Sequence, residues 1–155
     1  MHTEHLQNVH PVRILAGWLV SIAVTSAVVF GLIGLGLLRE ETAATDAVWA
    51  VLAVGVGFLV GGWFTGFRTL EAPILHGIAL GLTSLVAWAV LNLVVVIGFG
   101  AGEWTGLGTT AALVVLLTQV IAAVAGCWAG TARARSRADE ISTTPAAGVR
   151  ERGRE

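Results

Sequence analysis

Four long stretches without any charged residue divide this chain, and they constrain its fold more than any other feature. They run over 14–38, 47–67, 72–102 and 104–132, and each contains between 21 and 31 residues. An α-helix needs about 20 mainly apolar residues to cross a hydrocarbon core about 30 Å thick. Each stretch is long enough for one crossing and too short for two, which predicts four transmembrane helices.

The composition agrees with this prediction. Charged residues make up only 12% of the chain and hydrophobic residues 55%, whereas soluble domains carry about 25% charged residues. No alternating pattern of the kind that forms a membrane barrel is present, so we expect an all-α polytopic membrane protein built from two antiparallel hairpins. The expected parts are a polar leader (1–12), a transmembrane domain (13–132) with helices over about 14–38, 46–67, 73–100 and 107–132, and a disordered cytoplasmic tail (133–155).

The arginines predict the orientation of these helices. If the N-terminus is cytoplasmic, Arg39 alone lies near a helix end on the outer side, and five arginines lie near helix ends on the inner side. Those five are Arg13, Arg68, Arg133, Arg135 and Arg137. The positive-inside rule therefore places both termini in the cytoplasm, and we expect these arginines to meet anionic headgroups of the inner leaflet. His76, just inside the third helix, is expected to turn its polar edge toward the headgroups, or to bind an anionic headgroup beside Arg68.

Glycines recur in pairs at a spacing of four residues. The pairs are Gly57 and Gly61, Gly62 and Gly66, Gly77 and Gly81, and Gly126 and Gly130. In lipid, small residues at this spacing allow two helix backbones to approach closely. We expect most pairs to pack inside a four-helix bundle. Whether one pair faces outward, to form a homo-oligomer or to bind another membrane protein, stays open.

The ends of the second and fourth helices resemble each other. Each has two glycines four residues apart and then an arginine: Gly62, Gly66 and Arg68 in one, Gly126, Gly130 and Arg133 in the other. The first and third helices also share a Thr-Ser pair. This similarity indicates an internal repeat of one hairpin, although glycine-rich apolar helices also produce such matches by chance.

Polar side chains gather at the depth expected for the middle of the membrane. They are Thr25, Ser26, Ser84, Thr118 and Gln119, with Asn92 about two turns further out. This belt predicts either a binding site for a small neutral solute or lipid, or hydrogen bonds between helices worth about 0.6 kcal/mol each. For Ser and Thr the structural role is favoured, and for Asn92 and Gln119 both roles stay open. On the third helix one stripe, predicted to face the bundle interior, contains Gly77, Gly81, Ser84, Trp88 and Asn92.

The uncharged stretches contain none of the groups that most membrane chemistry requires. Proton-coupled and cation-coupled carriers normally need an ionisable side chain within the membrane, and here every charge lies outside the four stretches. Cys127 is the only cysteine, and the sequence shows no phosphate loop, no metal-ligand cluster and no nucleophile with a nearby base. We therefore predict a protein that is not an enzyme and that uses no cofactor, metal or nucleic acid.

The segment from Gly61 to Trp88 resembles a family. In the uncharacterised small four-helix membrane proteins of Gram-positive bacteria, the second helix ends in Gly-Gly-x-x-x-Gly-x-Arg, and the third begins with His-Gly-x-x-x-Gly. The matching residues are Gly61, Gly62, Gly66, Arg68, His76, Gly77 and Gly81, over about a fifth of the chain. The resemblance implies a multi-pass protein of a bacterial cytoplasmic membrane and implies nothing about activity.

Two functions are consistent with these observations. The first is a non-enzymatic accessory or assembly component that packs against itself or a membrane-protein partner through a glycine face. The alternative is a small channel or uncoupled carrier that passes a neutral solute or lipid along the polar belt. A closely packed interior would favour the first function, and a continuous path between the helices would favour the second.

Overall fold

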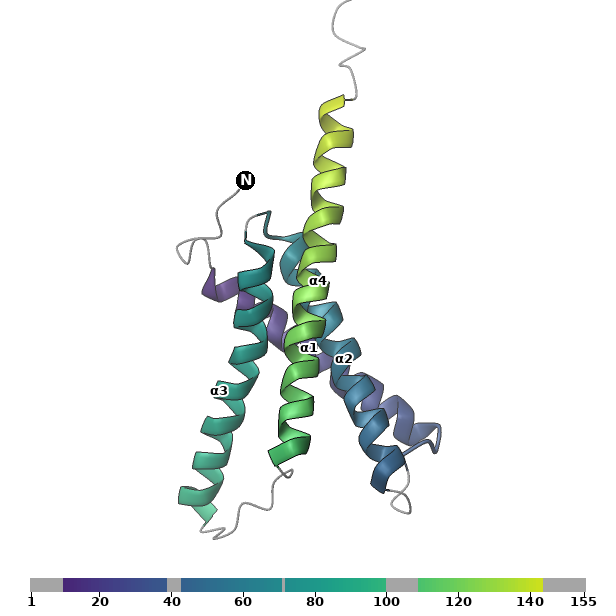
Figure 1. The fold of residues 1–155 in the computed structure, drawn as a ribbon, viewed down its shortest axis with the longest axis vertical. Helices are drawn as coiled ribbons and strands as arrows, with labels where there is room; N and C mark the ends of the chain where they lie inside the picture. The colour runs from purple at the N-terminus through teal and green to yellow at the C-terminus, as the bar shows by residue number, and fades with distance from the viewer. Residues whose placement is uncertain (1–9, 39–42, 71, 100–108, 144–155) are drawn as a thin grey trace, which may run out of the picture.

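The protein consists of four α-helices in the part of the chain that the structure describes. The computed structural model describes residues 10–38, 43–70, 72–99 and 109–143, and no strand occurs among them. The helices are α1 (Pro11–Gly34), α2 (Ala43–Phe67), α3 (Pro73–Phe99) and α4 (Thr109–Thr143) (Figure 1). Each is long and apolar enough to cross a membrane. The all-α prediction with four candidate spans is confirmed.

Proline and glycine set three of the helix ends. Pro11 and Pro73 stand at the starts of α1 and α3, where the missing proline N–H has no intrahelical partner to lose. α1 ends at Gly34, four residues before the predicted end, because Gly36 has a φ of 69° and leaves the helix. The Leu37 and Gly36 amides donate to the carbonyls of Leu32 and Ile33, which is the Schellman pattern.

The prediction of a disordered tail from residue 133 is wrong for its first part. α4 continues to Thr143, so it extends eleven residues beyond the predicted end of the transmembrane domain. The physical reason is local: between Gly130 and Pro145 the chain contains neither glycine nor proline, and alanine and arginine favour helix. The rest of the predicted tail lies outside the described residues.

Glycines bring the helix backbones together. Each of the eight predicted packing glycines is buried, and a Cβ atom added to any of them would overlap a neighbouring helix. Gly57 and Gly61 of α2 lie against Ser21 of α1, while Gly77 and Gly81 of α3 lie against α4. The remaining four, Gly62, Gly66, Gly126 and Gly130, form the contact between α2 and α4. All eight are therefore used in contacts within one chain.

The contact between α2 and α4 is reciprocal. Gly126 and Gly130 follow Gly62 and Gly66 by 64 residues, and this offset is used below to compare positions in α2 and α4. Gly62 lies against Ala123 and Gly126 lies against Leu59, which is the residue that corresponds to Ala123. Gly66 meets Cys127, and Gly130 meets Trp63, its counterpart. The residue pairs across this contact are therefore related by an approximate two-fold exchange of α2 and α4.

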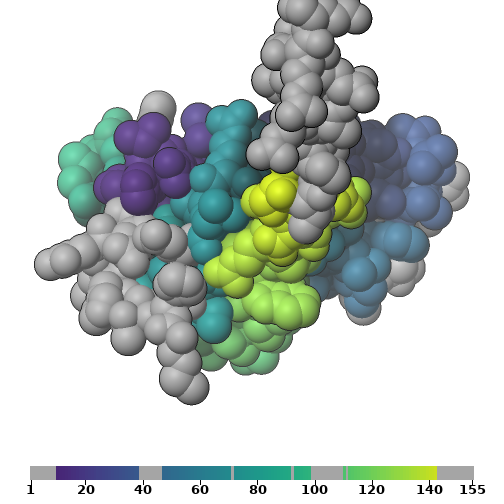
Figure 2. Space-filling view, turned by 90° about the horizontal axis from the view of Figure 1, so that it is seen from above, coloured from purple at the N-terminus to yellow at the C-terminus, as the bar shows by residue number. Residues whose placement is uncertain are grey.

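The four helices are packed most closely at one end. This end, called the arginine end below, carries all the described arginines: Arg13, Arg68, Arg133, Arg135 and Arg137. The buried core of Ile14, Phe58, Leu80 and Ala123 lies between it and the middle of the bundle. Toward the opposite end α3 separates from the other helices, while α1 and α2 lean to the other side (Figure 1). Seen from above, the far ends of α3 and of α1 and α2 project on opposite sides of α4 (Figure 2).

Candidate functional site

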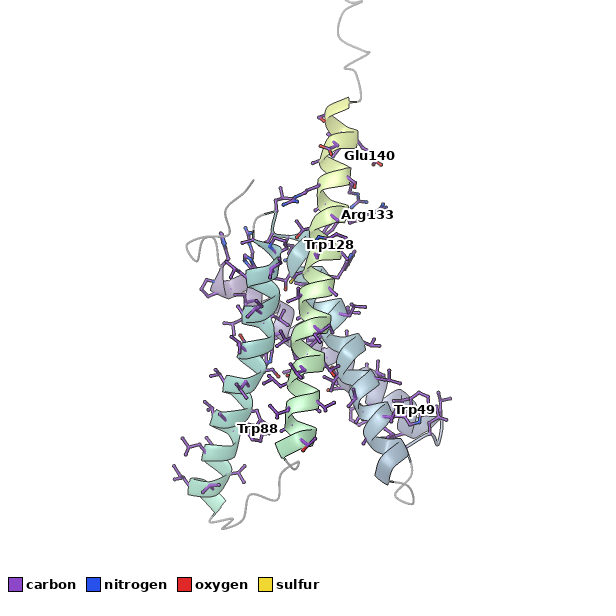
Figure 3. All side chains as sticks on the ribbon, in the orientation of Figure 1. Trp49, Trp88, Trp128, Arg133 and Glu140 are labelled. Carbon is purple, nitrogen blue, oxygen red and sulfur yellow. The ribbon has the colours of Figure 1, made fainter. Side chains whose placement is uncertain are left out.

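A cleft lies between α3 and α4 in the half of the bundle away from the arginine end. It has a volume of about 240 Å³ and is partly open to the outside. The residues that line it are Ser84, Leu85, Trp88, Ala112, Leu113, Val115, Leu116 and Gln119. Trp88 lies between the two helices (Figure 3). The cleft is smaller than the 300–1,000 Å³ typical of sites for drug-sized ligands, so it fits a small molecule or part of a larger one.

The side chains of the predicted α3 stripe explain why the cleft forms where it does. A Cβ atom at Gly77 would lie 2.5 Å from the Val124 Cα, and one at Gly81 would lie 3.0 Å from the Val120 Cα. At these two turns the backbones of α3 and α4 are therefore in contact. The next residues of the stripe are Ser84 and Trp88, which are larger and hold the helices apart. Increasing side-chain size along one face thus opens the cleft.

The polar groups of the cleft are neutral. Gln119 contributes an amide that can both donate and accept a hydrogen bond, and Ser84 contributes a hydroxyl from the facing helix. Both residues are partly buried and lie at the end of the cleft nearest the middle of the helices. The other lining residues are apolar, apart from the indole of Trp88, and none is charged. This arrangement suits an uncharged, mainly apolar ligand that carries one or two hydrogen-bonding groups.

The predicted polar belt is not one continuous ring. Thr25 packs against Gly57 of α2, and its buried hydroxyl has no hydrogen-bond partner. Thr118 donates to the Val114 carbonyl of its own helix at 2.8 Å, and its methyl group faces Gly55. Ser26 is exposed. Only Ser84 and Gln119 come together in the cleft, and the side chain of Asn92 lies outside the description.

His76 lies inside the bundle and not among headgroups, so both predictions for it are wrong. Its side chain is 0% exposed. The backbone N–H of His10 donates to its Nε2 at 3.3 Å, which places the ring hydrogen on Nδ1, and Nδ1 donates to the Ala72 carbonyl at 2.9 Å. His10 is the N-cap of α1. His76 therefore fastens the start of α1 to the start of α3.

The arginines of α4 lie beside the connection between α2 and α3. Arg135 donates to the Leu70 carbonyl at 2.8 Å, and the Arg137 guanidinium lies 5.9 Å from the centre of the Phe67 ring. Arg68 stacks in the same way over Phe64, at 4.4 Å. Arg13 and Arg133 are exposed. The helical extension of α4 thus holds two of its arginines against the end of α2.

Three buried threonines that the sequence analysis did not single out also organise this end. The Thr131 hydroxyl lies 3.0 Å from the carbonyls of both Gly66 and Thr69 and shares its one proton between these backbone groups at the end of α2. Thr65 and Thr69 donate to carbonyls one turn earlier, those of Gly61 and Thr65. The usable signal was the position of Thr131 directly after Gly130, where a short hydroxyl can reach the neighbouring backbone.

Comparison with protein-family models, with curated proteins and with solved structures finds no match for this chain. The predicted resemblance to small four-helix membrane proteins of Gram-positive bacteria therefore stays a prediction. Among the described residues no group of three His, Cys, Asp or Glu side chains could hold a metal ion. The cleft and its neutral polar groups are the arrangement from which a function can be argued.

Proposed function

We propose that the protein is a multi-pass membrane protein that binds a small, neutral, lipid-dissolved molecule in the cleft between α3 and α4. The observation that carries this proposal is the pairing of Gln119 with Ser84 in an otherwise apolar, partly open cleft. A ligand would enter from the bilayer, place its apolar body against Leu85, Leu113 and Leu116, and bond its carbonyl or hydroxyl group to Gln119. A ligand that covers the partly buried Gln119 amide without bonding it would bind less well, which would select ligands able to bond it.

The internal comparison supports a role for Gln119 beyond packing. At the offset of 64 residues, the position in α2 that corresponds to Gln119 is Gly55. Gly55 lies near the methyl group of Thr118, in the contact between α2 and α4. The fold therefore accommodates a residue without a side chain at this depth, and an amide there is not needed to hold two helices together.

Closure of the cleft toward the arginine end favours binding over conduction. Leu80 and Ala123 are both 0% exposed, and Gly81 lies against the backbone of α4. A molecule in the cleft would meet this packed region before reaching the arginine end. The proposal is therefore a binding protein or an uncoupled carrier, and a water-filled channel through the described helices is less well supported.

An accessory or assembly role remains a second proposal, in a changed form. The predicted glycine faces are used within the chain, so a partner would have to bind elsewhere. The cleft between α3 and α4 is one concave surface that could accept a side chain of such a partner. This accessory role is a proposal, and so is the absence of enzymatic activity.

Topology and origin are also proposed. We propose two related antiparallel hairpins, α1 with α2 and α3 with α4, and the reciprocal contact of α2 with α4 supports this repeat. We propose that the arginine end faces the cytoplasm of a bacterial cell, with both termini inside, because five arginines gather there. Accessibility labelling of single cysteines placed near Arg68 and near residue 103 would test the orientation.

Photocrosslinking tests the ligand proposal directly. The full-length protein in lipid nanodiscs would be exposed to a long-chain alcohol that carries a diazirine, and labelled peptides would be identified by mass spectrometry. We expect labelling of residues 84–88 and 112–119, and we expect Gln119→Leu to lower it about fivefold, which corresponds to one hydrogen bond. Thr118→Val is the matched control, since it removes a polar group at the same depth outside the cleft. Equal labelling of both variants would contradict the proposal.

A further inference from the structure

A second groove lies on the outside of the bundle, between α2 and α4, in the half toward the arginine end. It encloses about 230 Å³ and is lined by Leu59, Val60, Trp63, Gly126 and Ala129. All of these side chains are apolar apart from the indole N–H of Trp63. Trp63 is 44% exposed, as expected for a side chain on the outside of the bundle. The groove is distinct from the cleft between α3 and α4.

Two stacked aromatic rings connect this groove with an arginine side chain. The rings of Trp63 and Phe67 are stacked, with centroids 5.5 Å apart. The Arg137 guanidinium lies 5.9 Å from the centre of the Phe67 ring. The groove, the two rings and the guanidinium therefore form one continuous path along the end of α2.

A second arginine lies on the same face of α4. Residues 126, 130, 133 and 137 follow one another at intervals of three or four, and Ala129 precedes Arg133 by four, so these residues share one side of the helix. Ala129 lines the groove, and Arg133 and Arg137 stand one and two turns beyond it. Both arginines are exposed. At a rise of 1.5 Å per residue, Arg133 and Arg137 lie about 6 Å and about 12 Å beyond Ala129. The headgroup region of one leaflet is about 5–8 Å thick, so a lipid with its chain beside Ala129 can bring its phosphate group to these arginines.

We propose that this groove binds one anionic phospholipid, with an acyl chain along Leu59, Trp63 and Ala129 and the phosphate group between Arg133 and Arg137. The apolar groove and the two guanidiniums at its end match a molecule with a long apolar chain and a terminal anion. Glu140 lies about one turn beyond Arg137 on α4 and is farther from the groove, so it weakens the field at the phosphate without blocking the path. This site is separate from the proposed ligand cleft and does not depend on it.

Native mass spectrometry of the full chain in detergent tests the site. The protein would be titrated with dioleoylphosphatidylglycerol, with dioleoylphosphatidylcholine and with glycerol phosphate. Each arginine near an anionic headgroup contributes about fivefold to affinity, so we expect phosphatidylglycerol to bind about 30-fold more tightly than phosphatidylcholine. Glycerol phosphate should bind far more weakly than either lipid. If it displaced phosphatidylglycerol at equal concentration, the site would be a phosphate site without a chain groove, and the proposal would be overturned.

Matched variants distinguish lipid binding in the groove from nonspecific attraction of anionic lipids to the arginines at this end. Arg133→Gln combined with Arg137→Gln should reduce the lipid preference to about onefold to twofold. Arg13→Gln removes a charge at the same end but from α1, and should leave the preference within about twofold of the wild type. If Arg13→Gln reduced the preference as much per charge, the arginines at this end would act without a defined site, which overturns the proposal.

Two further variants keep both arginines. Ala129→Leu fills the groove on the exposed side of α4, so we expect phosphatidylglycerol affinity to fall about tenfold while glycerol phosphate binding is unchanged. Unchanged lipid affinity in this variant would also overturn the proposal. Glu140→Gln removes the nearby negative charge and should strengthen phosphatidylglycerol binding by about twofold to threefold.

Discussion

The contact of α1 with α2 and the contact of α3 with α4 begin alike at the arginine end and then differ. In the first pair, Gly61 and Gly57 keep the backbones together as far as Thr25, and Ala53, one turn further, is 0% exposed. In the second pair, the close approach ends at Gly81. Beyond it, the same face of α3 continues with Ser84 and Trp88, which line the cleft. Leu117, which is 64 residues after Ala53, is 58% exposed and does not line the cleft. Small residues therefore continue along the face of α2 in the packed pair, whereas larger residues follow Gly81 on α3 in the open pair.

Replacing a glycine of the central contact should have the largest effect. Gly66→Val places a branched side chain against the Cys127 backbone, which cannot move without separating α2 from α4. We expect a loss of about 3 kcal/mol in the free energy of unfolding, measured by denaturant titration in detergent. Gly31→Ala is the control, since a Cβ atom there meets nothing within 4 Å, and it should leave stability within about 1 kcal/mol. Similar losses for both variants would show that glycine acts through the helix backbone and not through the contact.

An exchange between positions 53 and 117 tests whether burial decides how large a side chain each position accepts. Ala53→Leu introduces into α2 the residue that α4 has at the corresponding position, and we expect it to cost about 2 kcal/mol because the site is fully buried. Leu117→Ala, the reverse change, should alter stability by less than about 0.5 kcal/mol because Leu117 is exposed. The comparison fails if Ala53→Leu is tolerated as well as Leu117→Ala in the same titration.

Filling the open cleft should make the second pair resemble the first. Ala112→Phe adds a ring to the lining of the cleft and should reduce photocrosslinking of the alcohol probe at least about fivefold, to the level of Gln119→Leu. Thermal unfolding should shift little, because the cleft has room for the ring. Val114→Phe adds the same ring on the exposed side of α4 and should leave crosslinking unchanged. Loss of crosslinking in the control would mean that the probe labels the lipid-facing surface in general.

The smallest expected effect concerns a hydroxyl inside the packed pair. Thr25→Val removes a buried hydroxyl that has no partner, so we expect a gain of about 0.5–1 kcal/mol in the free energy of unfolding. Thr118→Val removes a hydroxyl that is bonded to the Val114 carbonyl, and no gain is expected. If Thr25→Val destabilised the protein, the hydroxyl would contribute to the contact with Gly57, and the first pair would be held by more than close packing.

Much of the scaffold could be predicted from the distribution of charges and small residues. The four uncharged stretches became the four helices because a charge within an apolar helix is costly, and Pro73 begins α3 as its residue type favours. The packing glycines were also identifiable, since their spacing matches the helix repeat. Which helix each glycine meets was not, because spacing fixes a face and not its neighbour.

The features that sequence reasoning missed depend on three-dimensional neighbours. His76 was assigned to the headgroups because it follows a polar loop, yet the start of α1 covers it and uses it as a hydrogen-bond acceptor. The cleft could not be located because Thr118 and Gln119 are adjacent in sequence but face different helices. The helical extension of α4 was missed because composition alone does not separate a polar helix from a disordered tail.

The helical extension of α4 leaves long segments of this helix on both sides of its contact with α2. Figure 1 shows α4 as one straight helix. The α2 backbone contacts it at Gly126 and Gly130, near the middle of its length. From Gly126 to Ala112 at the cleft is about 21 Å, and from Gly126 to Thr143 is about 26 Å, at 1.5 Å per residue. The two distances are similar. A rigid tilt of α4 about Gly126 that moved Ala112 by about 1 Å would therefore move Thr143 by about the same distance in the opposite direction. Binding of a ligand in the cleft would therefore move the far end of α4, near Thr143, which lies beyond the apolar part of the helices.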